Sequence, residues 1–430
     1  MKNVISSQTR RCDEQPVGGV KAWWIWALGV TFVVFLFSFQ TGYSASNLRV
    51  QQDIGLTIAQ VSMVAAVYTW VFAVGQFFSG ALLDRLGAGR VTPVAISLVT
   101  VGIFIFANAQ SFEMLLVAQF VIACGACCGF VGAGFIGGQW FGLAKYSVMF
   151  GLVQVVASTG SSFSQNLINI GLDQMHWRIF FNSYAVFGVL LAILAFVFVR
   201  NRTPATGMGQ DGAGVFLKSV VKNIITVGKM PHIIVVSIMS ATTFATWLSM
   251  GIIWARRLLQ SVHGFDPGWA NFGGSLIFLG MAVGSAIVPR ISDITQKRKP
   301  LMIAGAAIQL VTLLALLYVP NPGLLFALVT CFLFGLGSSG SMLPFSSAAD
   351  VVKPDQVGTS AAIVNGVSFI LAGFMMSRPG VIIERGMAAG TDMGLFDIAQ
   401  AAAMPLLFCA AIPVVLGFFM KESYPTQRSA

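Results

Sequence analysis

Charged residues are scarce in this chain of 430 residues: Asp, Glu, Lys and Arg make up 9% of it, whereas hydrophobic residues make up 56%. A soluble globular protein carries about 25% charged residues, so a soluble fold of this length is excluded. Runs of roughly 20 apolar residues, the length that crosses a bilayer, recur between short polar breaks. The composition therefore predicts an integral membrane protein.

Several kinds of chemistry are also missing. The six cysteines are scattered and show neither a disulfide framework nor the paired spacing of a metal site. No phosphate-binding loop ending in Gly-Lys-Ser or Gly-Lys-Thr is present, which argues against ATP-driven transport. Gly335, Gly337 and Gly340 match a dinucleotide-binding spacing, but they lie in an apolar helix without a preceding strand. We expect no enzyme activity, no cofactor and no metal.

Acidic residues are absent from the middle of every predicted helix, although a buried carboxylate is the usual proton relay of a symporter. Glu113 and Asp350 lie near helix ends. Facilitated diffusion, exchange, and coupling through Glu113 or Asp350 therefore stay open. The expected partner is a small-molecule substrate, with a coupling proton or a counter-substrate as alternatives.

The apolar runs predict an all-α polytopic membrane protein with twelve transmembrane helices. Their expected ranges are 22–45, 58–82, 91–109, 112–136, 146–170, 178–199, 232–255, 268–289, 300–319, 322–344, 358–380 and 399–420. Short polar connections join them, which indicates one integrated bundle that contacts the lipid bilayer over most of its surface.

The segment 200–231 is the one long connection, and its turn-forming residues indicate a linker. It separates an N-terminal six-helix half from a C-terminal one. The predicted division is a tail 1–21, a half 22–199, the linker 200–231, a half 232–420 and a tail 421–430. Within the linker, a short interfacial helix is predicted by Val215, Phe216, Val220, Val221 and Ile224.

The net charge of +10 is concentrated in the connections. Most of the 25 Lys and Arg residues fall on one side if the N-terminus is cytoplasmic, in both tails, in the linker and in alternate loops. This bias predicts cytoplasmic termini by the positive-inside rule. The same distribution argues against a nucleic-acid partner, and we expect a monomer.

Two loops six helices apart share a pattern. The loop after 58–82 holds an acid, Asp84, followed by basic residues, and the loop after 268–289 repeats this with Asp293. Such a carboxylate can pair with basic groups or with a neighbouring helix N-terminus in one conformation and separate in another. We predict a conformational gating loop made of Gly80, Asp84, Arg85, Gly87, Arg90, Asp293 and Arg298.

The first of these loops resembles the signature loop of the major facilitator superfamily. Trp177-Arg178 and the stretch Gly358 to Ala362, followed by Asn365, also resemble recurring motifs of that superfamily. The stretch from Tyr43 through Arg90 resembles a subgroup of bacterial metabolite transporters that includes the phagosomal transporters of intracellular pathogens. The resemblance implies two pseudo-symmetric six-helix halves, alternating access and a bacterial inner-membrane location.

Three departures from the superfamily pattern matter. Gln119 stands where members often carry an Arg in the fourth helix, and Pro289 stands where glycine is usual in the second loop. Gly160 is followed by Ser161, whereas drug antiporters carry a Gly-Pro pair in the fifth helix. This last departure argues against drug efflux.

Polar residues form a stripe along the predicted helix 146–170. Gln154, Ser158, Ser161 and Gln165 step by four, three and four residues, so they share one helix face. We interpret the stripe as the lining of a substrate cavity, with polar contacts between helices as the alternative. The resemblance implies a central cavity lined by helices 1, 4, 7 and 10 with 2, 5, 8 and 11 beside them. The candidate substrate-binding residues are Gln40, Tyr43, Tyr68, Gln154, Ser158, Ser161, Gln165, Trp247, Arg256, Asn365 and Ser368.

Amides, hydroxyls and aromatic rings suit a small polar organic solute. The predicted function is a secondary transporter of an amino acid, a nucleoside or an organic acid. Arg256 either faces the cavity mouth or reaches to lipid headgroups. The alternatives are an exporter of a siderophore or toxic compound, which the missing Gly-Pro pair disfavours, and a membrane sensor, which lacks a soluble output domain.

Overall fold

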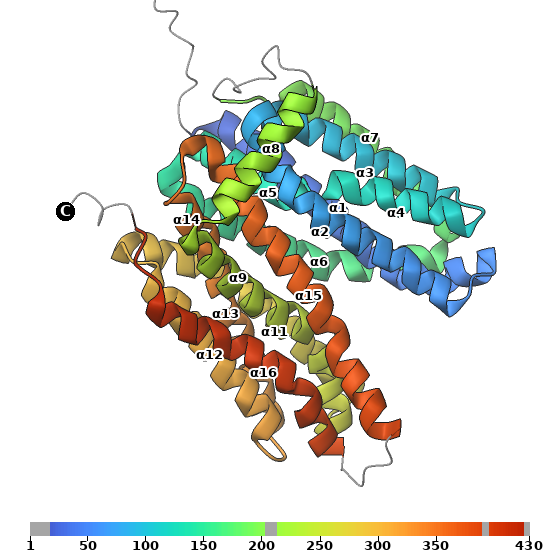
Figure 1. Cartoon of the computed structure of the whole chain (residues 1–430). Coiled ribbons are helices and arrows are strands. Elements are labelled where there is room, and N and C mark those ends of the chain that lie inside the picture. Colours follow the sequence, from blue (N-terminus) through green and yellow to red (C-terminus); the bar gives the residue numbers. More distant parts are fainter. Residues whose placement is uncertain (1–17, 203–212, 389–394, 425–430) are drawn as a thin grey trace, which may run out of the picture.

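The computed structural model describes residues 18–202, 213–388 and 395–424, and these residues form helices with short connections (Figure 1). Nine helical segments of the described part are long and apolar enough to cross a membrane. Three further helices, α2 (Ile58–Leu86), α6 (Tyr146–Gln174) and α16 (Leu395–Phe419), have 29, 29 and 25 residues, which is enough to span about 30 Å at 1.5 Å per residue. The predicted all-α layout of twelve membrane helices is confirmed.

The first six membrane segments precede the linker. They are α1 (Val20–Ile54), α2, α3 (Ala88–Ala107), the consecutive helices α4 (Phe112–Ala126) and α5 (Gly129–Phe141), then α6 and α7 (Trp177–Phe198). A single 3-10 turn, Leu143–Lys145, leads into α6. The linker contains α8 (Ala213–Gly228), so the short helix predicted there is confirmed.

The other six segments follow the linker. The seventh is α9 (Pro231–Ser249) continued by a π-helical turn Met250–Trp254, α10 (Ala255–Arg257) and a second π-helical turn Leu258–Val262. The remaining five are α11 (Pro267–Thr295), α12 (Lys299–Tyr318), α13 (Leu324–Ser338) with η4 (Ser339–Met342) and α14 (Leu343–Ala349), α15 (Val357–Ala388), which follows the turn Pro354–Gln356, and α16.

Figure 1 shows that the segments before and after the linker form two groups of helices that meet at one end and diverge toward the other. We call the meeting end the linker end, because α8 lies there. Both ends of the described chain are also there: the Gly18 N–H bonds the Trp140 carbonyl oxygen at 2.8 Å, and the Ser423 and Ser347 hydroxyls are 2.8 Å apart. The opposite end is called the far end.

The same capping contact occurs once in each group. In the first, the side-chain oxygen of Asn201, just beyond α7, accepts a hydrogen bond of 2.7 Å from the Gly89 N–H at the start of α3. In the second, the carboxylate of Glu422, just beyond α16, accepts bonds of 3.0 and 3.1 Å from the N–H groups of Arg298 and Lys299 at the start of α12. Each satisfies N–H groups that a helix start leaves unpaired. The repeat therefore extends beyond the two loops that the sequence reveals.

Several helices differ from their expected ranges: α15 runs eight residues past its predicted end, to Ala388, α11 runs six past, to Thr295, and three other segments differ as well. α1 continues to Ile54, nine residues past the predicted end at 45, because its last turns are held by ion pairs that Arg49 and Asp53 make to other helices. The predicted helix 112–136 is interrupted at Cys127 and Cys128 and runs on to Phe141. The seventh segment reaches Val262 because two π-helical turns each accommodate an extra residue without ending the helix.

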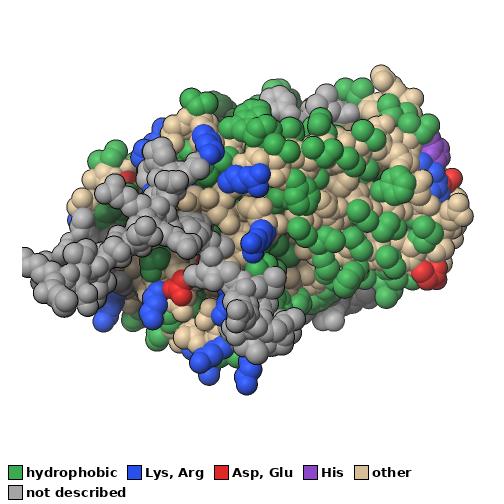
Figure 2. Space-filling model, turned by 90° about the horizontal axis from the view of Figure 1, so that it is seen from above, with side chains coloured by type: hydrophobic (Ala, Val, Ile, Leu, Met, Phe, Trp, Pro, Cys, Tyr) green, Lys and Arg blue, Asp and Glu red, His purple; other side chains and the backbone are tan. Residues whose placement is uncertain are grey.

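The outer surface is apolar over the middle of the molecule. Figure 2 shows hydrophobic side chains covering this region, with Lys and Arg gathered toward the linker end. The exposed apolar side chains include Val186, Phe408 and Phe418, with exposed fractions of 69%, 65% and 67%. Soluble proteins rarely expose contiguous patches of this kind, whereas a surface in contact with acyl chains requires them.

Replacing Glu422 with Ala removes both hydrogen bonds to the start of α12. We expect the free energy of unfolding to fall by about 1–2 kcal/mol, the usual cost of a lost helix N-cap. Thermal unfolding of the purified protein, followed by tryptophan fluorescence, measures the change. Lys421→Ala alters an exposed neighbour and should leave the midpoint in place. Equal midpoints for the two variants would contradict the capping role.

Candidate functional site at the joint between the two halves

Asp84 joins the two groups of helices at the linker end. Its carboxylate lies near the end of α2 and accepts three hydrogen bonds of 2.8 Å from the start of α15: from the N–H of Gly358, the N–H of Thr359 and the Thr359 hydroxyl. Unpaired N–H groups and the positive end of the helix dipole favour an anion at this place. The predicted gating acid thus caps a helix of the other group.

The contact requires glycine on both helices. A side-chain carbon on Gly80 would collide with the backbone carbonyl of Gly358, and one on Gly358 would come within 2.7 Å of the Asp84 carboxylate. The absence of side chains lets α2 and α15 approach closely enough for Asp84 to reach the N–H groups.

The rest of the first gating loop surrounds this contact. Gly87 ends α2 with a φ of 76°, a conformation that favours glycine, and a side chain there would collide with Asn201. Arg85 is half-buried and Arg90 is exposed at the linker end. Gly87 therefore sets the tight turn into α3, while the two arginines carry positive charge at the rim of the joint.

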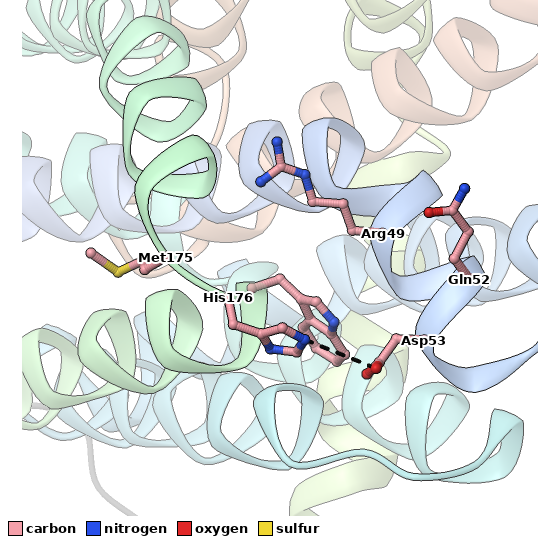
Figure 3. A pocket seen from close by; sticks show the side chains of 6 residues that line it. Arg49, Gln52, Asp53, Met175 and His176 are labelled. Atoms are coloured by element: carbon pink, nitrogen blue, oxygen red, sulfur yellow. Dashed lines mark ion pairs between the residues drawn. The ribbon is translucent and has the colours of Figure 1, made fainter.

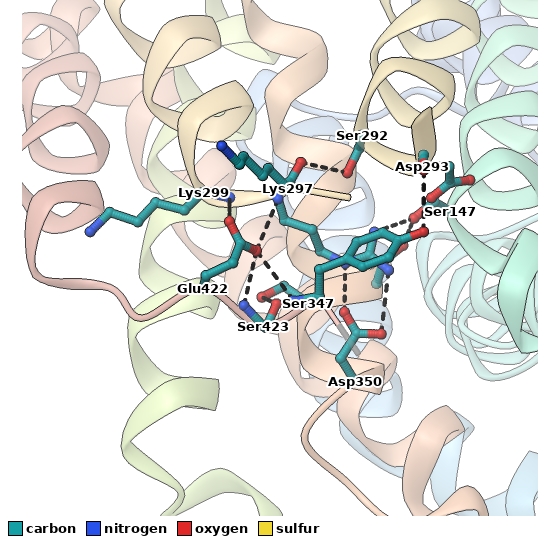
Figure 4. A network of polar contacts seen from close by, with 12 residues as sticks. Ser147, Ser292, Asp293, Lys297, Lys299, Ser347, Asp350, Glu422 and Ser423 are labelled. Atoms are coloured by element: carbon teal, nitrogen blue, oxygen red, sulfur yellow. Dashed lines mark hydrogen bonds and ion pairs between the residues drawn. The ribbon is translucent and has the colours of Figure 1, made fainter. Parts of the chain in front are cut away.

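A second joint connects the starts of α12 and α6 (Figure 4). Arg298, just before α12, pairs with Asp350 at 2.5 and 3.3 Å and donates a 2.5 Å hydrogen bond to the Ser147 hydroxyl at the start of α6. Ser147 in turn donates to Ser346 of α14 at 2.5 Å. The side chains of Arg298 and Asp350 are only 6% and 11% exposed, so solvent screens this ion pair little.

The C-terminal segment closes over the second joint. The ring of Tyr424 lies 5.1 Å from the Arg298 guanidinium, and its hydroxyl donates to the backbone carbonyl of Asp293 at 3.4 Å. Burial and the nearby carboxylates of Asp293 and Asp350 raise the pKa of Tyr424 above its ordinary value, against the opposing effect of Arg298, so the phenol remains a donor. The carboxylate of Asp293, predicted as the counterpart of Asp84, is half-buried beside this network, and the contact between the groups is made here by Arg298.

Above the first joint, two amides connect the groups in the interior. Asn365 of α15 donates a 2.9 Å hydrogen bond to the side-chain oxygen of Gln76 of α2, and both residues are buried. One turn along α15, the Ser368 hydroxyl lies 3.3 Å from that of Ser240 on α9, which donates to the carbonyl of Ser341 at 3.2 Å. Asn365 and Ser368, both predicted from sequence, thus belong to a buried polar layer.

Six aromatic rings continue from this layer across both groups. Successive centroids are 5.6, 4.8, 5.2, 5.4 and 5.3 Å apart along the series Tyr68, Phe72, Phe369, Phe244, Trp247 and Phe278. We call these six residues the aromatic row. Two predicted residues, Tyr68 and Trp247, belong to it. The buried indole N–H of Trp247 has no hydrogen-bond partner among the described residues.

The other predicted residues lie elsewhere. Gln154 and Ser158 of α6 are buried and bonded to each other at 2.8 Å. Gln40 has a buried amide nitrogen without a partner in the described part, whereas Tyr43 donates to the Val61 carbonyl at 3.3 Å and so ties α1 to α2. Arg256 is exposed near the far end. The side chains of Ser161 and Gln165 lie outside the described residues.

Sequence patterns identify several residues of the contacts between the two groups, but not the residues to which they bond. Ser147 and Ser346 sit beside helix ends without any distinguishing pattern, although they connect the two groups. Gln119, noted only as a departure, is fully buried on α4, and neither atom of its amide group has a partner among the described residues. Within the described ranges no three His, Cys, Asp or Glu side chains lie close enough to hold a metal ion.

A pocket of about 400 Å³ opens at the far end of the first group (Figure 3). Asp53 pairs there with Arg178 at 2.9 Å and lies 3.9 Å from His176. Arg178 also donates to the carbonyls of Ala107 and Ala109 at 3.3 and 2.5 Å. The Trp177-Arg178 motif therefore fastens α7 to the ends of α1 and α3.

Comparison with known proteins agrees with this arrangement. A sequence model of the Major Facilitator Superfamily matches residues 28–377. The chain belongs to the major facilitator superfamily. A solved structure of a proton:xylose symporter of this superfamily has a TM-score of 0.68 and 14% identity, and the match covers 94% of this chain and 97% of the symporter. The fold of two six-helix halves follows from this likeness, and the two groups of helices are those halves.

Curated relatives are transporters with different cargo. The probable galactarate/D-glucarate transporter of Bacillus subtilis is 22% identical over 376 residues, covering 78% of this chain and 81% of the relative. The lysosomal dipeptide transporter of Danio rerio is 24% identical, with 79% and 76% covered. A multidrug resistance protein of Shewanella sp. is 24% identical over 51% of this chain and 54% of the relative. This chain is a transporter of that superfamily, embedded as a multi-pass membrane protein.

Asp84→Asn keeps the size of the side chain but removes its charge and turns one acceptor oxygen into a donor that faces N–H groups. We expect the ratio of joined to separated linker ends to fall about tenfold, because hydrogen bonds to charged groups contribute about 1.5–3 kcal/mol. Spin labels at Ala144 and Lys353, exposed on opposite halves, report the distance.

The matched control is Asp173→Asn. Asp173 pairs with Arg49 at the far end and its side chain is 71% exposed, so the same chemical change there should leave the label distances alone. An Asp84→Asn protein with the wild-type distance distribution would refute the role of Asp84 in holding the halves together.

Proposed function

We propose that this chain is a secondary transporter that takes up a small polar organic metabolite by alternating access, and that its structure represents the state closed at the linker end. The observation that carries the proposal is the Asp84 carboxylate of one half bonded to the N-terminus of α15 in the other. Such a bond forms and breaks as a unit when the halves rock about a midplane site.

The orientation follows from charge. We assign the linker end to the cytoplasm of a bacterial inner membrane, because the basic residues on the face shown in Figure 2 gather toward that end. The state closed at the linker end is then outward-facing. A substrate would enter from the far end, between the diverging halves.

Within the class of polar metabolites, a neutral solute with a ring is favoured. Above the first joint, the Gln76–Asn365 amides and the Phe72–Phe369 rings meet across the halves, with the Ser240 and Ser368 hydroxyls close by, and none of these side chains carries a charge. Ring faces suit a planar group, and the amides suit the hydrogen-bonding edge of that group. A nucleoside fits this chemistry better than an organic acid, which would need a buried cation. Arg378 of α15 is another cation of the C-terminal half, but its side chain lies outside the described residues, so it does not enter this comparison.

Uptake of radiolabelled nucleosides, amino acids and organic acids into proteoliposomes tests the proposal. We expect saturable nucleoside uptake, with competition by other nucleosides and none by dicarboxylates. Uptake restricted to organic acids would contradict the neutral-solute assignment, and transport only of toxic cations in the outward direction would support an exporter instead.

Trp247→Phe keeps an aromatic ring in the row but removes the buried N–H. We expect KM to rise roughly two- to tenfold, since one hydrogen bond contributes about 0.5–1.5 kcal/mol, with kcat little changed. Trp70→Phe is the matched control, because Trp70 is 58% exposed on the outer surface. An unchanged KM in the Trp247→Phe transporter would remove this indole from the binding site.

A further inference from the structure

The linker helix α8 lies across the linker ends of α2 and α15 (Figure 1). It packs against both of these helices, one from each half, and touches α9 as well. Farther along the same two helices, apolar side chains are exposed on the outer surface. Trp70 and Val74 of α2 and Phe374 of α15 have exposed fractions of 58%, 57% and 43%. The helix therefore sits where the protein surface meets the headgroup region of the bilayer.

The two faces of α8 differ sharply. Val220 and Val227 are buried against the bundle, with exposed fractions of 1% and 0%. Lys218, Lys222 and Lys229 are exposed on the opposite face. At 3.6 residues per turn, these three lysines fall within an arc of about 40°, and the Lys229 N–H bonds the Ile225 carbonyl at 3.1 Å, which continues the helical turn.

Two apolar side chains lie beside the lysines, both on the same side of the arc. Val221 and Ile225 are 38% and 49% exposed and adjoin the lysine arc along the helix. No Asp or Glu occurs in Ala213–Gly228 to neutralise the lysines. A helix with lysines beside exposed aliphatic residues is typical of one that lies in a membrane interface, with its apolar groups among the acyl chains and its cations near the phosphates.

We propose that this lysine face of α8 (Lys218, Lys222 and Lys229 with Val221 and Ile225) is a binding site for anionic phospholipid headgroups. Each lysine near an anionic membrane surface adds attraction, and the aliphatic pair adds the contact with acyl chains that a soluble anion cannot supply. Because α8 packs against both α2 and α15, the two helices that Asp84 joins, bound lipid stabilises the state closed at the linker end. Linkage requires that this state in turn binds the lipid more tightly.

The site is independent of the transported substrate. Full-length protein in nanodiscs of phosphatidylcholine, with or without phosphatidylglycerol, tests it without any assumption about cargo or orientation. Native mass spectrometry of protein released from the nanodiscs counts the retained phosphatidylglycerol. We expect the triple variant K218Q/K222Q/K229Q to bind this lipid about ten- to a hundredfold more weakly, whereas K218R/K222R/K229R, which keeps the charge, retains it.

The matched control removes the same charge from the same end of the molecule. Lys145, Lys353 and Lys421 are exposed at the linker end but lie outside α8, so K145Q/K353Q/K421Q should retain the lipid. Equal loss in both triple variants would show that the lipid follows overall charge and would overturn the proposal. Displacement of the lipid by inorganic phosphate at matched ionic strength would also overturn it, because the site would then recognise the anion alone.

The conformational consequence has its own measurement. Spin labels at Ala144 and Lys353 should show a larger fraction of joined linker ends in phosphatidylglycerol than in phosphatidylcholine, and this difference should vanish in K218Q/K222Q/K229Q. A lipid-dependent shift that persists in this variant would place the effect elsewhere than α8. Loss of lipid binding without any shift would refute the coupling to the joint.

Discussion

A carboxylate removed from water is stable only while donors replace its hydration, and Asp84 obtains those donors from the opposite half of the protein. Three hydrogen bonds from Gly358 and Thr359 meet it at the start of α15. The close approach of α2 and α15, the glycines that permit it and the position of α8 across both helices all depend on this contact. If the halves separate, water must take the place of these donors around the carboxylate.

In the middle of the bundle, away from the joint, the polar contacts are made between uncharged groups. Lipid surrounds the bundle, so polar groups must find partners within it. The Gln76–Asn365 pair and the Ser368, Ser240 and Ser341 contacts do this between uncharged groups. Ion pairs occur toward the ends, as Arg298 with Asp350 and Arg178 with Asp53 illustrate. Under the proposed function, a solute crossing the middle of the protein would meet rings and amides, which can exchange partners at small electrostatic cost.

Helix number, loop motifs and the linker helix could be predicted because each is a local property of composition or spacing. The partner of Asp84 could be predicted as a class, a helix N-terminus, but its identity depends on residues 274 positions away. The contacts of Ser147 and the order of rings in the aromatic row could not be predicted for the same reason. Periodicity indicates which face of a helix is polar or aromatic, but not which helix packs against that face. The π-helical turns of the seventh segment could not be predicted from the apolar residues, because each turn adds only one residue inside a continuous helix.

The two capping contacts beyond α7 and α16 are alike in place and unlike in charge. Asn201 binds the start of α3 through a neutral amide oxygen, whereas Glu422 binds the start of α12 through a carboxylate. Dissolved salt screens the second contact and hardly affects the first. We therefore expect the two caps to respond unequally to ionic strength: rising salt weakens the hydrogen bonds that Glu422 accepts at the start of α12 and leaves the one that Asn201 accepts at the start of α3 nearly unchanged.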